Sequence, residues 1–295
     1  MKYTRLLRQG SRGNDVRILQ YKLTGKGFNT FGIDGIFGPN TYLAVKKFQK
    51  HSNIGVDGIV GRQTVNALNS TDKYEVLRPN AQTTVVRIPH KNIKDIKTIM
   101  ASNNIRAESL QSMKNRTKVD LIINGGLYFY SRVHKKNWSI NLLFVDGKQI
   151  VAGQYSRFCL LVDKNGTYEF DWYKWDKNKQ SMIGGSPSLI INNKIKIDKG
   201  VMEDSLINNR HPRSAIGMST THFYMVVIDG RNASRGLYGM TIRELANYMK
   251  SLGCHSAINL DGGGSSKIIG SSTLNKNREN RGIHNSIGIV LKQKG

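Results

Sequence analysis

The chain has 295 residues, with 45 lysine and arginine residues against 20 acidic residues, and its formal net charge is +25 at pH 7. This length exceeds that of a typical single domain, so two domains are expected. Two cysteines are too few for a disulfide-stapled scaffold, and no apolar run is long enough to cross a membrane as a helix.

Residues 1–70 predict a small three-helix bundle. Apolar residues begin a helical spacing at Val16, and Pro39 suits the first turn of a second helix. An Asp-Gly turn at Asp34 recurs at Asp57, before a third short helix. We interpret both aspartates as turn-formers, because Asp before Gly accepts local backbone N–H groups. The segment resembles the peptidoglycan-binding module of bacterial and phage wall hydrolases.

The sequence starts directly with this module, and no signal-peptide core precedes it. A wall-binding protein without its own export signal suggests a phage lysin or virion part, although a removed signal would look identical. An extracellular or cell-wall location is expected. Ser70–Lys73 is the expected linker to a second domain, which spans residues 75–295.

The second domain contains more predicted strands than helices. The predicted strands are Val85–Ile88, Val119–Ile123, Leu142–Val145, Phe158–Val162, Leu189–Ile191, Ala215–Met218, Phe223–Ile228, Ala257–Leu260 and His284–Leu291. Helices are predicted at Asn103–Lys114 and Ile242–Leu252, and Thr241 with Glu244 forms a capping box before the second. Strands and helices do not alternate regularly, so the expected fold class is α+β, with a larger mixed-sheet domain after the all-α bundle.

Two apolar runs in this domain stop at an Asp followed by Gly, namely at Asp229 and Asp261. A carboxylate at such a strand end lies where the backbone turns and a ligand can reach it. A lone Asp-Gly is more often an ordinary turn. After Asp261, however, Gly262–Gly264 leave a backbone without Cβ atoms and Ser265 adds a hydroxyl, which suits an anionic or sugar ligand.

Several motifs between residues 75 and 293 resemble those of the phosphodiester glycosidase family, in the family's order. They are Asn124-Gly125-Gly126, Gly184-Gly185-Ser186-Pro187-Ser188-Leu189, Arg213-Ser214-Ala215-Ile216-Gly217, Asp229-Gly230-Arg231, Asn259-Leu260-Asp261-Gly262-Gly263-Gly264-Ser265-Ser266, and Arg281 with Asn285. The best-known member of this family removes N-acetylglucosamine from a phosphodiester and so uncovers mannose 6-phosphate. The sequence departs from the family pattern at Leu127, which precedes the usual aromatic, and before Arg281, where the usual Pro-Ser is missing. These departures concern the sugar preference more than the chemistry.

The resemblance implies the catalytic residues. Asp261 is the expected nucleophile or base, with Asp229 as its partner. Arg213 and Arg231 are expected to hold a phosphate, because the planar guanidinium matches phosphate oxygens bidentately. The expected substrate-binding residues are Asn124, Gly125, Gly126, Asn259, Gly262, Gly263, Gly264, Ser265 and Arg281.

The sequence predicts neither a metal nor a cofactor. It contains no H-E-x-x-H, His-x-His or Cys/His cluster of the kind that binds zinc, and no Walker-type loop. A G-x-S-x-G elbow is also missing, which argues against a serine hydrolase. Cys159 and Cys254 are interpreted as buried thiols, and a bridge between them stays open.

The positive charge is spread over the whole chain, with +8 in residues 1–70 and +17 in the remainder. Such a chain could bind nucleic acid through its phosphates. No helix-turn-helix signature, zinc-finger spacing or aromatic RNA-binding motif is present, so nucleic acid is not expected as a partner. Teichoic acids are also polyphosphates and would attract the protein by the same Coulomb force. The expected partners are therefore peptidoglycan and anionic wall polymers.

These observations predict a cell-wall-targeted glycosidase that cleaves a sugar-1-phosphodiester bond of the GlcNAc-1-phosphate type. The linkage between teichoic acid and peptidoglycan is the expected substrate, and the product is a phosphate monoester. Two alternatives stay open: a hydrolase of the peptidoglycan glycan strand, such as a muramidase, and a non-enzymatic wall-binding virion protein. The sequence does not indicate an oligomeric state.

Overall fold

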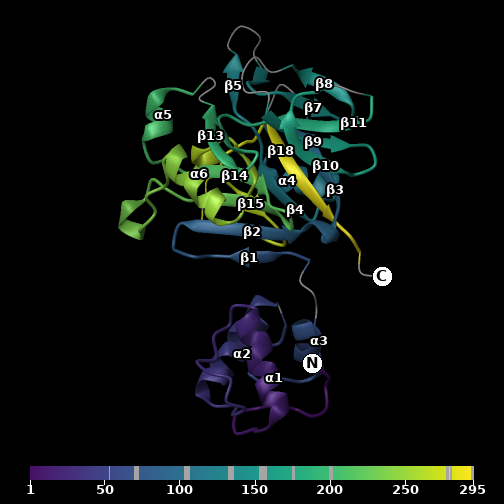
Figure 1. The fold of residues 1–295 in the computed structure, drawn as a ribbon, viewed down its shortest axis with the longest axis vertical. Helices are drawn as coiled ribbons and strands as arrows, with labels where there is room; N and C mark the ends of the chain where they lie inside the picture. The colour runs from purple at the N-terminus through teal and green to yellow at the C-terminus, as the bar shows by residue number, and fades with distance from the viewer. Residues whose placement is uncertain are drawn as a thin grey trace. The chain divides into compact units, whose positions relative to one another are not determined.

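The structure is a computed structural model that describes residues 1–52, 54–69, 73–102, 107–131, 136–152, 158–174, 177–198, 202–276, 279 and 281–293. The chain divides into two compact units, Met1–Asp72 and Lys73–Gly295, and each has its own hydrophobic core (Figure 1). Residues 70–72 of the expected linker lie outside the described residues. Among the described residues, no helix is both long enough and apolar enough to span a bilayer.

The first unit contains the helices α1 (Asn14–Gly25), α2 (Pro39–His51) and α3 (Arg62–Asn69). Two buried glutamines hold its two Asp-Gly turns in the same way. Gln20 Nε2 donates to Asp34 at 2.8 Å, and its Oε1 accepts the N–H of the following glycine at 2.9 Å. Gln49 repeats both bonds at Asp57, each at 2.8 Å. The two aspartates are thus confirmed as turn-formers.

The second unit is built on a seven-stranded sheet with the order β1-β2-β15-β14-β16-β12-β13. These strands are β1 (Glu75–Leu77), β2 (Thr83–Pro89), β15 (His222–Ile228), β14 (Arg213–Met218), β16 (Ser256–Asn259), β12 (Ser188–Ile191) and β13 (Lys194–Asp198). Strand β15 is buried on both faces, with alternate residues in two different core clusters. This double burial explains its continuous apolar run.

One face of this sheet packs against two further sheets, with the orders β17-β4-β18-β3 and β10-β9-β11-β7-β8. Their strands are β17 (Ile268–Ile269), β4 (Leu121–Asn124), β18 (Asn285–Leu291), β3 (Ile93–Met100), β10 (Tyr168–Trp172), β9 (Phe158–Asp163), β11 (Lys179–Gly184), β7 (Leu143–Val145) and β8 (Lys148–Val151). A hairpin of β5 (Tyr128–Ser131) and β6 (Lys136–Ser139) stands apart from them. The α+β class is confirmed, and the pairs between described strands are antiparallel rather than mixed in direction.

The other face of the large sheet is covered by α6 (Ile242–Ser251), which packs against β12, β13 and β16. Its capping box is present as expected, with Thr241 accepting the Glu244 N–H and Glu244 accepting the Thr241 N–H. The shorter helices are α4 (Leu110–Thr117) and α5 (Asp204–Asn208). Helix α4 begins later than expected because the Ser109 hydroxyl caps it; residues 103–106 of the prediction lie outside the described residues.

The two cysteines are buried free thiols, so no bridge joins them. Cys159 lies on β9 and Cys254 follows α6. Burial raises the pKa of both thiols, to about 12 for Cys254, so neither is a reactive thiolate at neutral pH.

Candidate active site

The ends of β4 and β16, which belong to two different sheets, are tied together at Asp261. Asn124 Nδ2 donates to the Asp261 carbonyl at 2.7 Å across 137 positions of sequence. The Asp261 N–H in turn donates to the Gly125 carbonyl at 2.9 Å. The predicted motifs at residues 124–126 and 259–266 therefore meet, and their backbones hold Asp261 in place.

Asn124 and Asn259 differ in what they leave free for a ligand. The Asn124 amide is fully engaged, since its oxygen accepts the Ser214 hydroxyl at 2.7 Å and the Lys267 N–H at 3.2 Å. Asn259 Nδ2 donates to the Ser186 carbonyl at 2.7 Å, but its buried Oδ1 has no hydrogen-bond partner in the described part of the chain. Of the two, only Asn259 borders the pocket described next.

Asp261 opens into a pocket with an apolar wall and a cationic wall. The apolar wall is made by Leu127, Met202, Leu206 and Leu260, and the cationic wall by Arg213, Arg231 and Arg281. Besides Asp261, the lining is completed by Asn259, His211, Pro212, Gly262 and Gly263. Three guanidinium groups beside one carboxyl group give this pocket a chemistry that suits an anionic ligand.

Burial raises the pKa of the Asp261 carboxyl above its ordinary value. Three neighbours oppose this rise by stabilising the charged form: the Ser265 hydroxyl, the Gly262 N–H at 2.9 Å from Oδ1, and the charge of Arg281. Burial dominates, so the group is a perturbed carboxyl in a pocket, which is the usual property of a catalytic acid, base or nucleophile.

Arg213 is held by the protein more than the sequence suggests. The residue is 3% exposed, and its Nε donates to the Met240 carbonyl at 2.8 Å. Its Nη2 donates to the carbonyls of Leu206 and Asn209. Burial and the nearby charge of Arg231 lower its pKa to about 10. Three of its five N–H groups are thus used within the protein, and those on Nη1 have no hydrogen-bond partner among the described residues.

Arg231 contrasts with Arg213, because its side chain is exposed and forms no hydrogen bond or ion pair with the described residues. Its guanidinium stands over the glycine loop, since a Cβ placed on Gly263 would lie 3.3 Å from Nη1. Its φ of 60° is left-handed, which costs energy for a residue with a side chain. A strained backbone that presents a free guanidinium to a pocket is a feature of binding sites.

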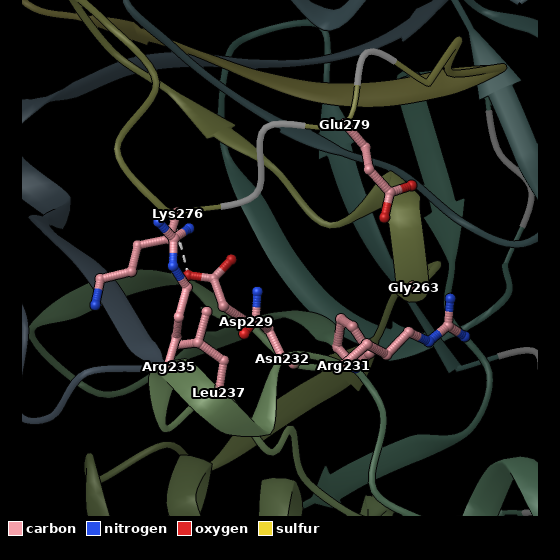
Figure 2. Close-up of a pocket in the computed structure, with 10 residues that line it drawn as sticks. Asp229, Arg231, Asn232, Arg235, Leu237, Gly263, Lys276 and Glu279 are labelled. Atoms are coloured by element: carbon pink, nitrogen blue, oxygen red, sulfur yellow. Dashed lines mark hydrogen bonds between the residues drawn. The ribbon is translucent and has the colours of Figure 1, made fainter.

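Asp229 does not share the pocket of Asp261. It is buried, and Oδ1 accepts the Asn275 side-chain amide at 2.8 Å while Oδ2 accepts the Lys276 N–H at 2.9 Å. It borders a second pocket, which Figure 2 shows together with Arg235 and Lys276. The two pockets have Pro212, Arg231 and Gly263 in common. The structure therefore places the two predicted carboxylates in adjoining pockets.

Gly125 and Gly126 permit close packing of the strand ends and do not border the Asp261 pocket. A Cβ on Gly125 would lie 2.7 Å from the Asn285 carbonyl oxygen, and the Gly126 N–H donates to Asn285 Oδ1 at 2.7 Å. Gly264, Ser265 and Arg281 border a further pocket beside α4. Arg281 thus faces both that pocket and Asp261.

Three further residues close to the predicted motifs were not among the predicted site residues. His211 borders the Asp261 pocket, and burial followed by the charges of Arg213 and Arg231 lowers its pKa. Tyr128 donates to the Gly282 carbonyl at 2.8 Å, and burial and the charge of Asp261 raise its pKa. Asn141 is fully buried, and neither of its amide atoms has a partner among the described residues. His211 carried a sequence signal in its position two residues before Arg213, and Tyr128 in being the aromatic that follows Leu127.

The described residues contain no group of three or more His, Cys, Asp or Glu side chains that could hold a metal ion. The site as described thus consists of one perturbed carboxyl, three arginines, one amide oxygen without a partner, and a glycine-rich backbone.

Two family models match the chain, one in each unit. Residues 117–290 match the model described as phosphodiester glycosidase, and residues 12–68 match a peptidoglycan binding domain. The chain is also 38% identical over 79 residues to a spore cortex-lytic enzyme of Bacillus cereus. That match covers 27% of this chain and 30% of the relative, so the chain spans less than a third of the curated relative it matches.

Two solved structures share the fold of the larger part of the chain. The catalytic domain of zebrafish N-acetylglucosamine-1-phosphodiester alpha-N-acetylglucosaminidase aligns with a TM-score of 0.60 at 16% identity, covering 74% of this chain and 82% of that one. A hypothetical protein from Synechocystis aligns with a TM-score of 0.54 at 13% identity, covering 74% and 61%. At these identities the likeness concerns the fold.

Proposed function

Because the chain belongs to the phosphodiester glycosidase family, we propose that its larger unit hydrolyses a sugar-1-phosphodiester. The observation that supports this most strongly is the pocket in which the perturbed Asp261 carboxyl faces Arg213, Arg231 and Arg281. The arginines suit the phosphate, and the carboxylate suits the positive charge that develops on the anomeric carbon. In a sugar-1-phosphodiester, the negative phosphate and the anomeric carbon that becomes positive are joined through a single oxygen.

The leaving group explains why one carboxylate is enough in this pocket. Cleavage between the anomeric carbon and the phosphate oxygen releases a phosphate monoester, which leaves far more readily than a sugar alkoxide. Strong general-acid help is therefore less necessary than in ordinary glycosidases. Asp261 acts on the anomeric carbon as nucleophile or base. Asp229, whose two oxygens hold Asn275 and Lys276, acts as a positioning residue.

The remaining pocket residues divide between the two halves of the substrate. The phosphate oxygens accept hydrogen bonds from Arg231 and from the free Nη1 of Arg213, and Arg281 adds a third positive charge. The Asn259 Oδ1 accepts a hydrogen bond from a sugar hydroxyl or an acetamido N–H, because it is a buried acceptor that has no partner among the described residues. Leu127 and Met202 pack against the apolar parts of the ligand.

The first unit directs this activity to the cell wall. A peptidoglycan binding domain spans residues 12–68, and residues 1–70 carry a charge of +8. Many Gram-positive walls attach teichoic acid to peptidoglycan through a sugar 1-phosphate esterified to a muramic acid hydroxyl. That linkage is a glycosyl phosphodiester beside peptidoglycan, in an anionic polymer layer that concentrates a basic protein. It is the substrate we propose, and it places the enzyme outside the cell or in the wall.

Treatment of purified walls with the protein tests this substrate. We expect release of teichoic acid with a free reducing sugar, while the peptidoglycan retains a phosphate monoester with a pH-dependent phosphorus NMR signal. The Asp261→Asn variant is the control, because it keeps the binding domain and the positive charge. New reducing ends on the glycan strands without a phosphate monoester would instead indicate a peptidoglycan strand hydrolase. Neither product, on several wall types, would favour a non-enzymatic binding role.

A further inference from the structure

The second pocket, which adjoins the Asp261 pocket, has three cationic side chains on its wall. Arg231, Arg235 and Lys276 border it, and none of these side chains has a hydrogen bond or ion pair with the described residues. Figure 2 shows Arg231 extending away from the other two, on the opposite side of Asp229. A concave surface with three cations that have no partner among the described residues suits an anion.

Two carboxylates, Asp229 and Glu279, also border this pocket, and the three cations outnumber them by one charge. Asp229 Oδ1 accepts a hydrogen bond from the Asn275 side-chain amide, and Oδ2 accepts one from the Lys276 backbone N–H. The residue is 3% exposed. The Glu279 carboxylate lies against the glycine loop, because a Cβ placed on Gly264 would be 3.1 Å from its Cδ. The pocket therefore keeps an excess of positive charge toward solvent.

The position of Lys276 in this pocket is fixed by the fold. Asp229 follows β15 directly, and its carboxylate fixes the backbone N–H of Lys276 at 2.9 Å. Arg235 ends the 3-10 helix η2 (Ala233–Arg235), which begins a few residues after the same strand. One buried carboxylate thus brings a lysine from a distant turn to the two arginines that follow β15.

The second pocket continues from the Asp261 pocket, since Arg231, Gly263 and Pro212 border both. We propose that it binds the next phosphate of a polymeric leaving group, so that the substrate is a chain of repeated phosphodiesters rather than a single sugar phosphodiester. This inference rests on the proposed function. Arg231 contacts the phosphate at the scissile bond, while Arg235 and Lys276 bind the phosphate one repeat further along.

Two substrates with the same scissile bond test the inference. One is a methyl diester of N-acetylglucosamine 1-phosphate, and the other extends that diester with an oligo(glycerol phosphate). In the Arg235→Gln, Lys276→Gln double variant, the ratio of kcat/KM for the extended substrate to kcat/KM for the methyl diester should fall on the order of tenfold. The Lys148→Gln, Lys292→Gln variant removes the same charge from exposed positions elsewhere and should keep the wild-type ratio. An unchanged ratio in the first variant, or an equal fall in both, would overturn the inference.

A binding measurement separates this inference from the proposed function. Titration calorimetry of the full-length Asp261→Asn protein with oligo(glycerol phosphate) needs no turnover. We expect binding that weakens with salt and falls on the order of tenfold when Arg235→Gln and Lys276→Gln are added. Wild-type protein that cleaves neither substrate would refute the proposed function, while this titration would still decide about the pocket. Affinity for oligo(glycerol phosphate) that the two substitutions do not change would overturn the subsite. Inorganic phosphate that displaces the oligomer equally well, at equal phosphate concentration, would overturn it too.

Discussion

The Asp229 carboxylate accepts the backbone N–H of Lys276 at 2.9 Å, and this bond joins the end of β15 to a turn 47 positions further along the chain. The same carboxylate accepts the side-chain amide of Asn275 at 2.8 Å. A residue that the motif presents as a second catalytic carboxylate therefore has its two oxygens turned toward the protein. Its role can be separated from that of Asp261 by experiment.

Asp229→Asn should destabilise the protein and only partly reduce its activity. The asparagine amide has one NH2 group in place of an accepting oxygen. Either the Asn275 side-chain amide or the Lys276 backbone N–H therefore loses its acceptor. We expect a loss of about 1–3 kcal/mol in the free energy of unfolding, measured in urea. Asp146→Asn is the control, because this exposed residue has a left-handed φ of 49°, which Asn tolerates. Unchanged stability together with a complete loss of turnover would place Asp229 in the chemistry instead.

Asp261→Asn should abolish turnover, with a loss on the order of 4 kcal/mol or more in transition-state stabilisation. The effect on stability should be opposite in sign to that of Asp229→Asn. Burial raises the pKa of Asp261, so the folded state disfavours its charged form. The contribution of this group to the free energy of unfolding is fully present below the ordinary aspartate pKa, about 3.9. It is lost as the pH rises through the raised pKa of the folded state.

Thermal unfolding of the wild type and Asp261→Asn at a series of pH values measures this effect. The variant should gain stability relative to the wild type between about pH 3 and pH 7. A variant that instead becomes relatively less stable toward neutral pH would mean that Ser265, Gly262 and Arg281 outweigh burial. Activity of the wild type should rise with pH as the carboxyl ionises, with a midpoint above the ordinary aspartate value.

Arg213→Lys and Arg231→Lys should differ in what they damage. Arg213 donates to the carbonyls of Leu206, Asn209 and Met240, and a lysine cannot reproduce this fork, so we expect a loss of about 2–4 kcal/mol in stability. Arg231 is exposed and has no hydrogen bond or ion pair with the described residues, so its substitution should lower kcat/KM without moving the urea midpoint. Loss of activity at full stability in Arg213→Lys would contradict its structural role.

Gly125→Ala should destabilise the larger unit because its Cβ would meet the backbone of Asn285, with 2.7 Å to the carbonyl oxygen. Overpacking of this kind typically costs about 1–3 kcal/mol. Gly55→Ala is a matched control in the other unit, where only the side-chain oxygen of Gln63 lies within 4.0 Å. Urea unfolding of both variants measures the difference, and equal stability of the two would mean that the strand ends can move apart.

The strand ends and the capped helix could be predicted from local sequence, because Asp-Gly after an apolar run and a Thr-x-x-Glu box are short-range signals. The apolar run of β15 was recognisable for the same reason. The separation of Asp229 from Asp261 could not be predicted from local sequence. It depends on the turn at Asn275, which meets the end of β15 only in the folded unit. Asn141 carries no motif, and its buried amide becomes visible only beside Gly126 and Gly184.

The bond that breaks can be identified by hydrolysis in ¹⁸O-labelled water. The substrate is the methyl diester of N-acetylglucosamine 1-phosphate, and mass spectrometry locates the label in the products. Attack at the anomeric carbon, where Asp261 is proposed to act, should place the ¹⁸O on C1 of the released sugar and leave the phosphate unlabelled. Label in the phosphate would show that the phosphorus–oxygen bond breaks, and would contradict the glycosidase chemistry proposed for this site.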